Sequence, residues 1–543
     1  MAHLNSWFHR HMGIVLGFAL IGAASVTAVL SQSAIAVSPA QLTSLSVSPE
    51  AGTASEQTCP ATSARGALQA TTTRRWTSPK YVFFFIGDGM ANAQIHAAEA
   101  YLARAHQSTG IPGKPYPPDE PKAYQLRLSQ LPVCGMQTTY AADRFITDSA
   151  SAGTAMACGI KARDAVISKK LDGTDAVTIA ELAKDKGMKV GIISSVSINH
   201  ATPAVFYAHE ASRNNYYSIG VQLAESDFDF FGGGGFVRPD DYGTAPHVLD
   251  IAEANGFTVV SGASALAAVE PGARVIATDP YVDSGMALYY DIDRVDDPET
   301  MTLAEYTSEC IRLLQDHPGG FFMMVESGKI DWACHANDAR ASIDDTLAFD
   351  DAVGVAIDFM AMYPQETLIV VTGDHECGGL TIGWAGTAYN NFWSVLENQT
   401  VSYVGFAPIL ADYVAATPWS GVEDDIDDTL KDIILDCFGL DYATLTAYEQ
   451  SKLEAAYDRA RNGAPLVSAE EDYLLYGGYN ALTVTITHIL NQRAGLGWTS
   501  YAHTGVPLPV YAAGRGAYLF EGFYDNTDIA KKLATAMAVT LDN

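Results

Sequence analysis

Basic residues are scarce in this chain. It has 32 Lys and Arg against 63 Asp and Glu among 543 residues, for a net charge of -31 at pH 7. A surface this acidic repels phosphate backbones, which excludes nucleic-acid binding through a basic face. Disorder of the whole chain is excluded as well, because 48% of the residues are hydrophobic and 10% are aromatic, enough to bury a large core.

Cysteine is also sparse, and no two cysteines show the C-x-x-C spacing of a structural zinc site. Seven are too few for a disulfide scaffold at this length, and their odd number leaves at least one unpaired within the chain. Packed free thiols are the favoured interpretation. Cys334 and Cys377 stand beside candidate metal ligands, where a thiolate would compete for zinc. The seven are Cys59, Cys134, Cys158, Cys310, Cys334, Cys377 and Cys437.

Only one apolar run is long enough to span a membrane, and it lies near the N-terminus. Arg10 precedes the run from Met12 to Leu30, and the small-x-small motif Ala34-Ile35-Ala36 follows it. This order predicts a signal peptide over 1–36 that is cleaved after Ala36. An uncleaved anchor is the alternative. With cleavage, we expect an exported protein, periplasmic or secreted, that has no stable membrane anchor.

The rest of the chain is predicted to hold one large domain over 79–543. Residues 37–78 are rich in Ser, Thr, Ala and Pro, which indicates a flexible leader. Five prolines between residues 110 and 121 indicate a surface loop. Acidic and aromatic segments from about 381 to 479 interrupt the pattern of the domain. They predict an inserted subdomain with a helix from Leu445 to Arg461.

Four apolar runs in the domain predict buried strands, and each run ends in residues that can bind a metal. Helical patterns between them, such as Ala339 to Met362, complete an α/β alternation, so we expect a central, mostly parallel sheet flanked by helices. Ligands bind beyond the carboxyl ends of the strands in such sheets. One shared site is therefore predicted, and four unrelated turns are the alternative. The predicted strands are Tyr81–Ile86, Lys189–Ser194, Phe321–Val325 and Thr367–Val371.

The carboxylates and imidazoles in these motifs have metal-binding patterns. Asp331 and His335 are four residues apart, so on a helix they project from one face and can hold one ion. His503 is a candidate third ligand, because one Asp and two His leave zinc a position for substrate or water. Asp374 and His375 supply a carboxylate and an imidazole for a second centre.

Oxygen ligands follow the other strands. Asp88, after the first predicted strand, is expected to complete the second centre. Glu326 and Thr202 offer oxygen alone, which suits magnesium. For Thr202 the alternative is a helix N-cap, with Pro203 at the first helical position.

A candidate nucleophile lies in a run of small residues. Ser149 belongs to Thr147–Gly153, a composition that lets a helix begin close to a bulky anion. Its hydroxyl is a poor nucleophile at neutral pH unless a base or a metal ion lowers its pKa. Packing or helix capping is the alternative role.

Six motifs together carry a resemblance to a known family. They are Ile86-Gly87-Asp88-Gly89-Met90, Thr147-Asp148-Ser149-Ala150, Asn199-His200-Ala201-Thr202-Pro203, Val325-Glu326 with Ile330-Asp331-Trp332-Ala333-Cys334-His335, Thr372-Gly373-Asp374-His375, and His503-Thr504-Gly505. In composition and order they resemble the alkaline phosphatases, metal-dependent phosphomonoesterases, from about Lys80 to the C-terminus. The resemblance implies hydrolysis of small-molecule phosphate monoesters to an alcohol and inorganic phosphate through a phosphoserine intermediate. It also implies two zinc ions and one magnesium ion per chain.

The resemblance assigns a role to each matched residue. Ser149 would be the nucleophile that becomes phosphorylated. The first zinc would be held by Asp331, His335 and His503. The second zinc would be held by Asp88, Asp374 and His375. Asp88 would also bridge to the magnesium, completed by Thr202 and Glu326.

Four further residues lie where the family pattern continues or changes. Arg213 falls where the family places an arginine that clamps two phosphate oxygens, a role that suits bidentate guanidinium binding, and Asp148 can hold it. Taken alone, Arg213 is a surface ion-pair residue and Asp148 a turn carboxylate. His200 and Trp332 replace the Asp and Lys that the best-known bacterial members carry near magnesium. His200 is expected to reach magnesium through water, whereas Trp332 supplies no cation to the phosphate. We also expect a homodimer.

Other activities need other features. A related sulfatase requires a Cys or Ser in a C/S-x-P-x-R context, which Ser149–Gly153 lacks. A phosphodiesterase stays open at this point, because a pocket for a second ester substituent cannot be read from the sequence. An exported phosphate- or metal-binding protein without turnover would be expected to lack the nucleophile or a ligand, and none is missing.

Overall fold

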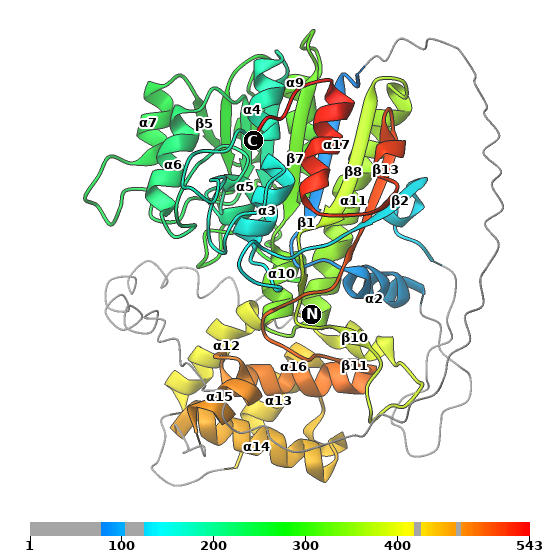
Figure 1. The fold of residues 1–543 in the computed structure, drawn as a ribbon. Coiled ribbons are helices and arrows are strands. Elements are labelled where there is room, and N and C mark those ends of the chain that lie inside the picture. The colour runs from blue at the N-terminus through cyan, green and yellow to red at the C-terminus, as the bar shows by residue number, and fades with distance from the viewer. Residues whose placement is uncertain (1–77, 104–123, 418–424, 463–467) are drawn as a thin grey trace, which may run out of the picture. The chain divides into compact units, whose positions relative to one another are not determined.

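The computed structural model describes residues 78–103, 124–417, 425–462 and 468–543 (Figure 1). The predicted signal peptide 1–36, all but the last residue of the predicted leader 37–78, and the proline-rich segment 110–121 lie outside these residues. No helix in the described part of the chain is long and apolar enough to cross a membrane.

A sheet that has ten strands among the described residues forms the centre of the fold (Figure 1). All of its ladders are parallel except those of β13, which runs against both neighbours. The prediction of a mostly parallel sheet flanked by helices is therefore confirmed. In spatial order the strands are β14 (Gly522–Tyr524), β2 (Val133–Gln137), β13 (Leu508–Gly514), β8 (Thr367–Gly373), β1 (Tyr81–Gly87), β7 (Phe321–Ser327), β3 (Lys189–Ser194), β4 (Phe230–Gly233), β6 (Val275–Thr278) and β5 (Thr258–Ser261).

The central strands are apolar on both faces because helices cover both sides of the sheet. Along β1, Phe83 and Phe85 point into one hydrophobic cluster, whereas Val82, Phe84 and Ile86 point into another. This alternation follows from the two-residue period of a strand. The four strands predicted from the sequence are β1, β3, β7 and β8, three of them slightly longer than predicted.

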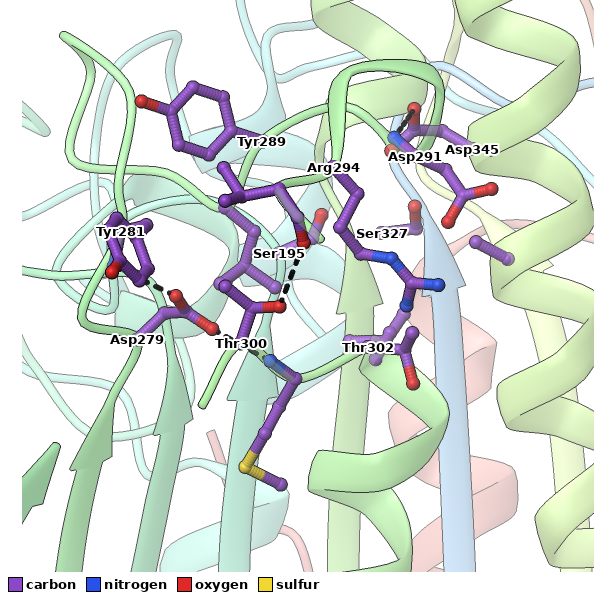
Figure 2. A pocket seen from close by; sticks show the side chains of 15 residues that line it. Ser195, Asp279, Tyr281, Tyr289, Asp291, Arg294, Thr300, Thr302, Ser327 and Asp345 are labelled. Carbon is purple, nitrogen blue, oxygen red and sulfur yellow. Dashed lines mark hydrogen bonds between the residues drawn. The ribbon is translucent and has the colours of Figure 1, made fainter. Parts of the chain in front are cut away.

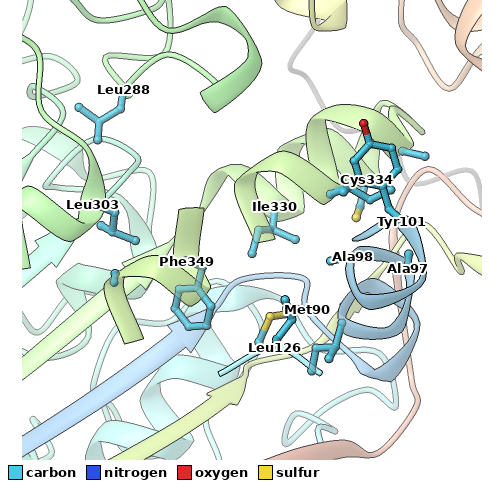
Figure 3. Close-up of a cluster of buried hydrophobic side chains, with 14 of the residues drawn as sticks. Met90, Ala97, Ala98, Tyr101, Leu126, Leu288, Leu303, Ile330, Cys334 and Phe349 are labelled. Atoms are coloured by element: carbon cyan, nitrogen blue, oxygen red, sulfur yellow. The ribbon is translucent and has the colours of Figure 1, made fainter. Parts of the chain in front are cut away.

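Helices form the outer layers. Residues of α2, α9 and α11 belong to the first cluster, and α11 packs against both other helices. Figure 3 shows Tyr101, Phe349 and Met90 in this cluster. Residues of α3, α4 and α17 belong to the second cluster. The bounds are α2 (Asn92–Ala103), α3 (Ser149–Cys158), α4 (Ile179–Asp185), α5 (Ala201–Ala204), α6 (Tyr216–Glu225), α7 (Val248–Ala254), α8 (Ala263–Ala267), α9 (Leu303–Leu314), α10 (Lys329–His335), α11 (Ala339–Met362) and α17 (Thr527–Met537).

The chain is mostly helical between β10 (Thr381–Ile382) and β11 (Leu496–Gly497), which pair with each other. Side chains from this segment, including Phe406, Leu430 and Ile486, belong to the same cluster as Phe83, so the segment shares the core on that side of the sheet. The last helix, α16, begins after residue 479 and packs on α12 and α14. The bounds of the insertion stay a prediction. The helices are α12 (Tyr403–Ala416), α13 (Asp428–Phe438), α14 (Ala447–Asn462), α15 (Ala469–Tyr476) and α16 (Ala481–Ala494).

The cysteines of the described residues carry free thiols. Cys134 is exposed, whereas Cys158, Cys310, Cys334, Cys377 and Cys437 are buried. Packed thiols are what the sequence predicted for these five. Cys59 lies outside the described residues.

Candidate active site

The register of the sheet brings the predicted second centre together: Asp88, Asp374 and His375. Gly87, the last residue of β1, lies beside Gly373 of β8, so the two aspartates that follow are neighbours. His375 Nε2 lies 3.4 Å from Asp88 Oδ1 and 3.2 Å from Asp374 Oδ2, and all three side chains are fully buried. The amides of Gly89 and His375 donate to Asp374 Oδ1, which fixes that carboxylate.

A second group of ligands shares Asp88. Ligand atoms of Asp88, His200 and Glu326 lie within 4.8 Å of one another, and all three residues are buried. The hydroxyl of Thr202 donates to Asp88 Oδ2 at 3.2 Å, and Ser194 donates to Glu326. Burial raises the pKa of Glu326 to about 7, against the hydrogen bonds that lower it.

The alternative role of Thr202 as a helix N-cap is wrong. The cap residue of α5 is His200, and Thr202 is the second residue inside the helix. Its hydroxyl is therefore free to reach Asp88, and Pro203 occupies the third helical position, where its lack of an amide hydrogen costs no intrahelical bond.

The predicted first centre consists of Asp331, His335 and His503. Asp331 and His335 come from α10, and His503 comes from the short strand β12 (His503–Thr504). The two Nε2 atoms of the histidines are 3.1 Å apart, and the Asp331 oxygens lie 3.3 Å from His335 Nε2 and 3.5 Å from His503 Nε2. The sequence predicted two members of this trio from their spacing and the third as a candidate from zinc's donor preference, to which the resemblance added the assignment.

The hydrogen bonds of these histidines favour a positive charge at the first centre. Nδ1 of His335 bonds the carbonyl of Tyr501 at 2.6 Å, and Nδ1 of His503 bonds the carbonyl of Thr147 at 2.7 Å. A carbonyl only accepts, so each Nδ1 carries the hydrogen and each neutral Nε2 faces the other as an acceptor. A cation between the two Nε2 atoms, or a proton on one of them, removes this unfavourable contact of two acceptors. Burial lowers the pKa of His335, but Asp331 outweighs burial and raises it to about 9.

Ser149 is the first residue of α3 and lies at the second centre. Its Oγ is 3.2 Å from His375 Nε2. Asp148 is the N-cap of α3 and accepts from the amide of Ser151 at 2.9 Å, so the helix start holds the serine in place. The rings of His375 and His503 stack with centroids 3.5 Å apart, which brings the two centres side by side.

Arg213 is held on two sides. One guanidinium nitrogen donates to Asp148 Oδ2 at 2.9 Å, and the other lies 3.3 Å from His200 Nε2. Burial and the arginine lower the pKa of His200 to about 3, so the imidazole is neutral and accepts. Burial raises the pKa of Asp148, but Arg213 outweighs it and the net shift is downward. Both residues therefore act as fixed acceptors for the guanidinium.

Several buried oxygens of the site lack a hydrogen-bond partner. Burial, together with the neighbouring carboxylates, raises the pKa of Asp88 and of Asp374 well above the usual value. Buried carboxylates that crowd one another without donors are stable when they bind cations. The donor sets fit the expected metals, since one Asp with two His, or two Asp with one His, suits zinc, and the oxygen-rich set suits magnesium. The unpartnered atoms are Asp88 Oδ1, Glu326 Oε1, Asp331 Oδ1 and Asp374 Oδ2.

Trp332 lies next to a buried ion pair between Lys329 and Asp283, which the sequence did not predict. Lys329 is fully buried, pairs with Asp283, and lies 5.0 Å from the Trp332 ring. Trp332 in turn meets His200 edge to face at 5.8 Å. The only signal in the sequence was a lysine beside apolar residues in the motif around Asp331.

A small cavity is lined in part by residues at the ends of β3 and β7. Ser195 and Ser327 line it, and each follows a residue, Ser194 or Glu326, that belongs to the metal-binding side (Figure 2). Its volume of about 40 Å³ is enough for a few water molecules. The residues that line it include neither Ser149 nor Arg213 nor any of the predicted metal ligands.

The family model described as "Alkaline phosphatase" matches residues 79–228 and 280–539, which is most of the chain. The chain belongs to the alkaline phosphatase family. The unmatched residues between the two blocks hold β4, β5 and β6 at one end of the sheet. The enzyme hydrolyses phosphate monoesters, and its activity depends on metal ions.

Individual relatives agree with the family. "Alkaline phosphatase 3" of Bacillus subtilis is 32% identical over 471 residues, which cover 84% of this chain and 89% of the relative. The cold-active alkaline phosphatase of Shewanella sp. superposes with a TM-score of 0.67 at 28% identity, covering 84% of this chain and 99% of that structure. The Thermus thermophilus alkaline phosphatase, which is 23% identical, shares the fold with a TM-score of 0.68. The superposition covers 88% of this chain and 96% of that structure.

Proposed function

We propose that the enzyme cleaves phosphate monoesters through a phosphoserine on Ser149, at a site with two zinc ions and one magnesium ion per chain. The observation that carries this is the position of Ser149 Oγ, 3.2 Å from His375 Nε2 at the start of α3. The hydroxyl is thus beside one set of candidate metal ligands, and Asp148, the residue before it, accepts a hydrogen bond from the guanidinium of Arg213.

Each ion has a set of protein ligands. Asp331, His335 and His503 would hold the first zinc, and Asp88, Asp374 and His375 would hold the second. Asp88, Thr202 and Glu326 would hold the magnesium. His200 belongs to the same group of residues, and the ring of Trp332 contacts His200 edge to face. When bound, the ions would lower the pKa of hydroxyl groups and neutralise developing negative charge.

The reaction takes two steps on this chain. Ser149 Oγ gives its proton to solvent and attacks phosphorus in line with the ester bond. The P–O ester bond breaks, its oxygen takes up a proton from solvent and leaves as the alcohol, and a phosphoserine forms. Water then attacks the same phosphorus from the vacated side, releasing inorganic phosphate and restoring the serine. Arg213 donates to two phosphoryl oxygens in both steps. Asp148 and His200 hold the guanidinium, so it needs little reorientation when substrate binds.

Trapping the intermediate tests this mechanism. After an acid quench with a radiolabelled aryl monoester, the wild type should carry phosphate on Ser149. Ser149→Ala should carry no label, and its kcat should fall by at least about 1,000-fold. Ser151→Ala, in the same helix, should keep the label. Full activity of Ser149→Ala would refute the phosphoserine route. A matched diester, assayed beside the monoester, should turn over slowly, and preference for it would overturn the substrate class.

We also propose a homodimer. Two segments that flank the site expose large apolar side chains, with Phe145 87%, Ile146 49% and Val506 43% exposed. They are adjacent, because a Cβ added to Gly505 would lie 3.3 Å from the carbonyl oxygen of Phe145. Such a patch is typical of a protein contact. Light scattering should give a dimer mass, and Phe145→Glu should give a monomer, whereas Phe523→Glu should not. A wild-type monomer would contradict the dimer.

Export follows from the N-terminal pattern. We propose that residues 1–36 direct export and are removed. The N-terminus of the mature protein should then be Val37, as N-terminal sequencing of the exported product would determine. A mature protein that begins at Met1 would favour the uncleaved anchor.

A further inference from the structure

Cys377 lies on the same face of a small sheet as His503. The strand β9 (Glu376–Cys377) pairs antiparallel with β12, and the register places Cys377 directly opposite His503. Residues opposite each other in such a pair point to one face, with Cβ atoms about 4.5–5.5 Å apart. The pairing therefore directs the thiol toward the first centre.

The sulfur belongs to the ligand group itself. Sγ of Cys377 and one ligand atom each of Asp331, His335 and His503 all lie within 4.8 Å of one another. Asp331 is 4% exposed, and its Oδ1, which faces His503 at 3.5 Å, has no hydrogen-bond partner. A fully buried thiol and a buried, unpartnered carboxylate oxygen thus share one space with two imidazole rings.

The neighbouring thiol provides a contrast. Cys334 is also fully buried and precedes His335 in the chain, yet its sulfur contacts the Ser342 hydroxyl at 3.3 Å and the Gln94 amide at 3.7 Å. It is not part of the ligand group. Of the two cysteines that stand beside metal ligands in the sequence, the structure thus selects one.

We propose that Cys377 is a fourth protein ligand of the first centre, engaged when a thiophilic divalent cation such as Cd²⁺ binds there. The inference rests on the proposed role of the other three residues as metal ligands. On binding, the S–H bond breaks, its proton passes to solvent, and the sulfur donates its electron pair to the cation. Thiolates prefer soft cations, and four protein ligands fill a tetrahedral shell. Such an ion leaves no position for substrate, so the cation occupies the site without supporting turnover.

Spectroscopy of the full chain, freed of metals, tests this with CdCl2 as the probe. The wild type should develop a near-ultraviolet sulfur-to-cadmium charge-transfer band that saturates at one equivalent for this centre. Cys334→Ser should develop the same band. Cys377→Ser should lack it and bind Cd²⁺ more weakly by on the order of 100-fold. An absent band in the wild type, or an equal band in Cys377→Ser, overturns the proposal.

A second measurement does not depend on how the variant folds. The ¹¹³Cd resonance of the wild-type chain should lie in the range of a site with one sulfur ligand, well downfield of an all-nitrogen-and-oxygen site. A resonance in the latter range overturns the proposal. Phosphoserine formation is measured separately, with the enzyme loaded with zinc and magnesium. If the cadmium experiments contradict a sulfur ligand, the proposed mechanism still stands. If no phosphoserine forms, the assignment of Cys377 still stands.

Discussion

The two groups of proposed zinc ligands lie side by side but are built from different kinds of structure. The second centre follows directly from β1 and β8, two adjacent strands in the middle of the sheet, and its side chains are fully buried. The first centre draws on a helix of seven residues and a strand of two, and the side chains of His335 and His503 are 28% and 13% exposed. One centre is thus fixed by the register of the sheet and the other by local segments that the rest of the fold must hold.

The largest effect is expected at Asp88, on the side of the site that the sheet builds. This carboxylate belongs both to the second centre and to the group with Glu326. Asp88→Ala should lower kcat/KM by about 10⁴-fold or more, since each tenfold loss corresponds to about 1.4 kcal/mol and a metal ion contributes several. His335→Ala, which affects the first centre alone, should lose about 10²- to 10³-fold. Steady-state kinetics with an aryl monoester measures both.

The comparison of Asp88→Ala with His335→Ala needs a control at a residue away from the site. Asp358→Ala, on the exposed side of α11, should leave kcat/KM unchanged. An equal loss for Asp88→Ala and His335→Ala would show that the two centres contribute equally, against the shared role of Asp88.

The helix that carries the first centre depends on a buried ion pair. Lys329→Met should remove the partner of Asp283 and lower the free energy of unfolding by about 3–5 kcal/mol, because it leaves a carboxylate buried without its cation. Denaturant unfolding of the metal-free chain measures this. Lys184→Met is the matched control, since Lys189 still pairs with Asp229, and it should cost less than about 1 kcal/mol. Similar losses of unfolding free energy for the two variants would contradict a particular dependence of α10 on the pair of Lys329 and Asp283.

A pH dependence should come from Asp338, which caps α11 just after the first centre and accepts from Gln399 and Tyr403. Burial raises its pKa from 3.8 to about 6, so its contribution to stability is full below about pH 4 and is lost as pH rises through 6. Asp338→Asn should therefore gain about 1–3 kcal/mol relative to the wild type between pH 4 and pH 7. Denaturant unfolding of both proteins at pH 4 and pH 7 measures this gain. The same difference in unfolding free energy between the variant and the wild type at the two pH values would refute the prediction.

The comparison also explains how much the sequence predicted. Asp88 and Asp374 were predicted to converge because parallel strands end at one edge, and Asp331 and His335 because four residues make a helical turn. His503 was named as a candidate from zinc's preference for one Asp and two His, and was assigned to this centre by resemblance, since its approach depends on a pairing with β9 that no local pattern predicts. The same pairing brings in Cys377, and the burial of Lys329 depends on Asp283, far away in the sequence. Contacts of this kind arise from tertiary packing, which periodicity and propensity do not encode.

The smallest effect should distinguish the centres by the rate at which they lose metal. Because His335 and His503 are partly exposed while the ligands of the second centre are 0% exposed, a chelator should remove the first zinc roughly tenfold faster than the second. Absorbance of a chromogenic chelator, mixed with the loaded enzyme, should follow two phases, and turnover should fall with the fast one. His335→Ala should lose the fast phase and keep the slow one. A single phase in the wild type would show that both ions leave through one opening of the site, so that burial of the individual ligands does not set their release.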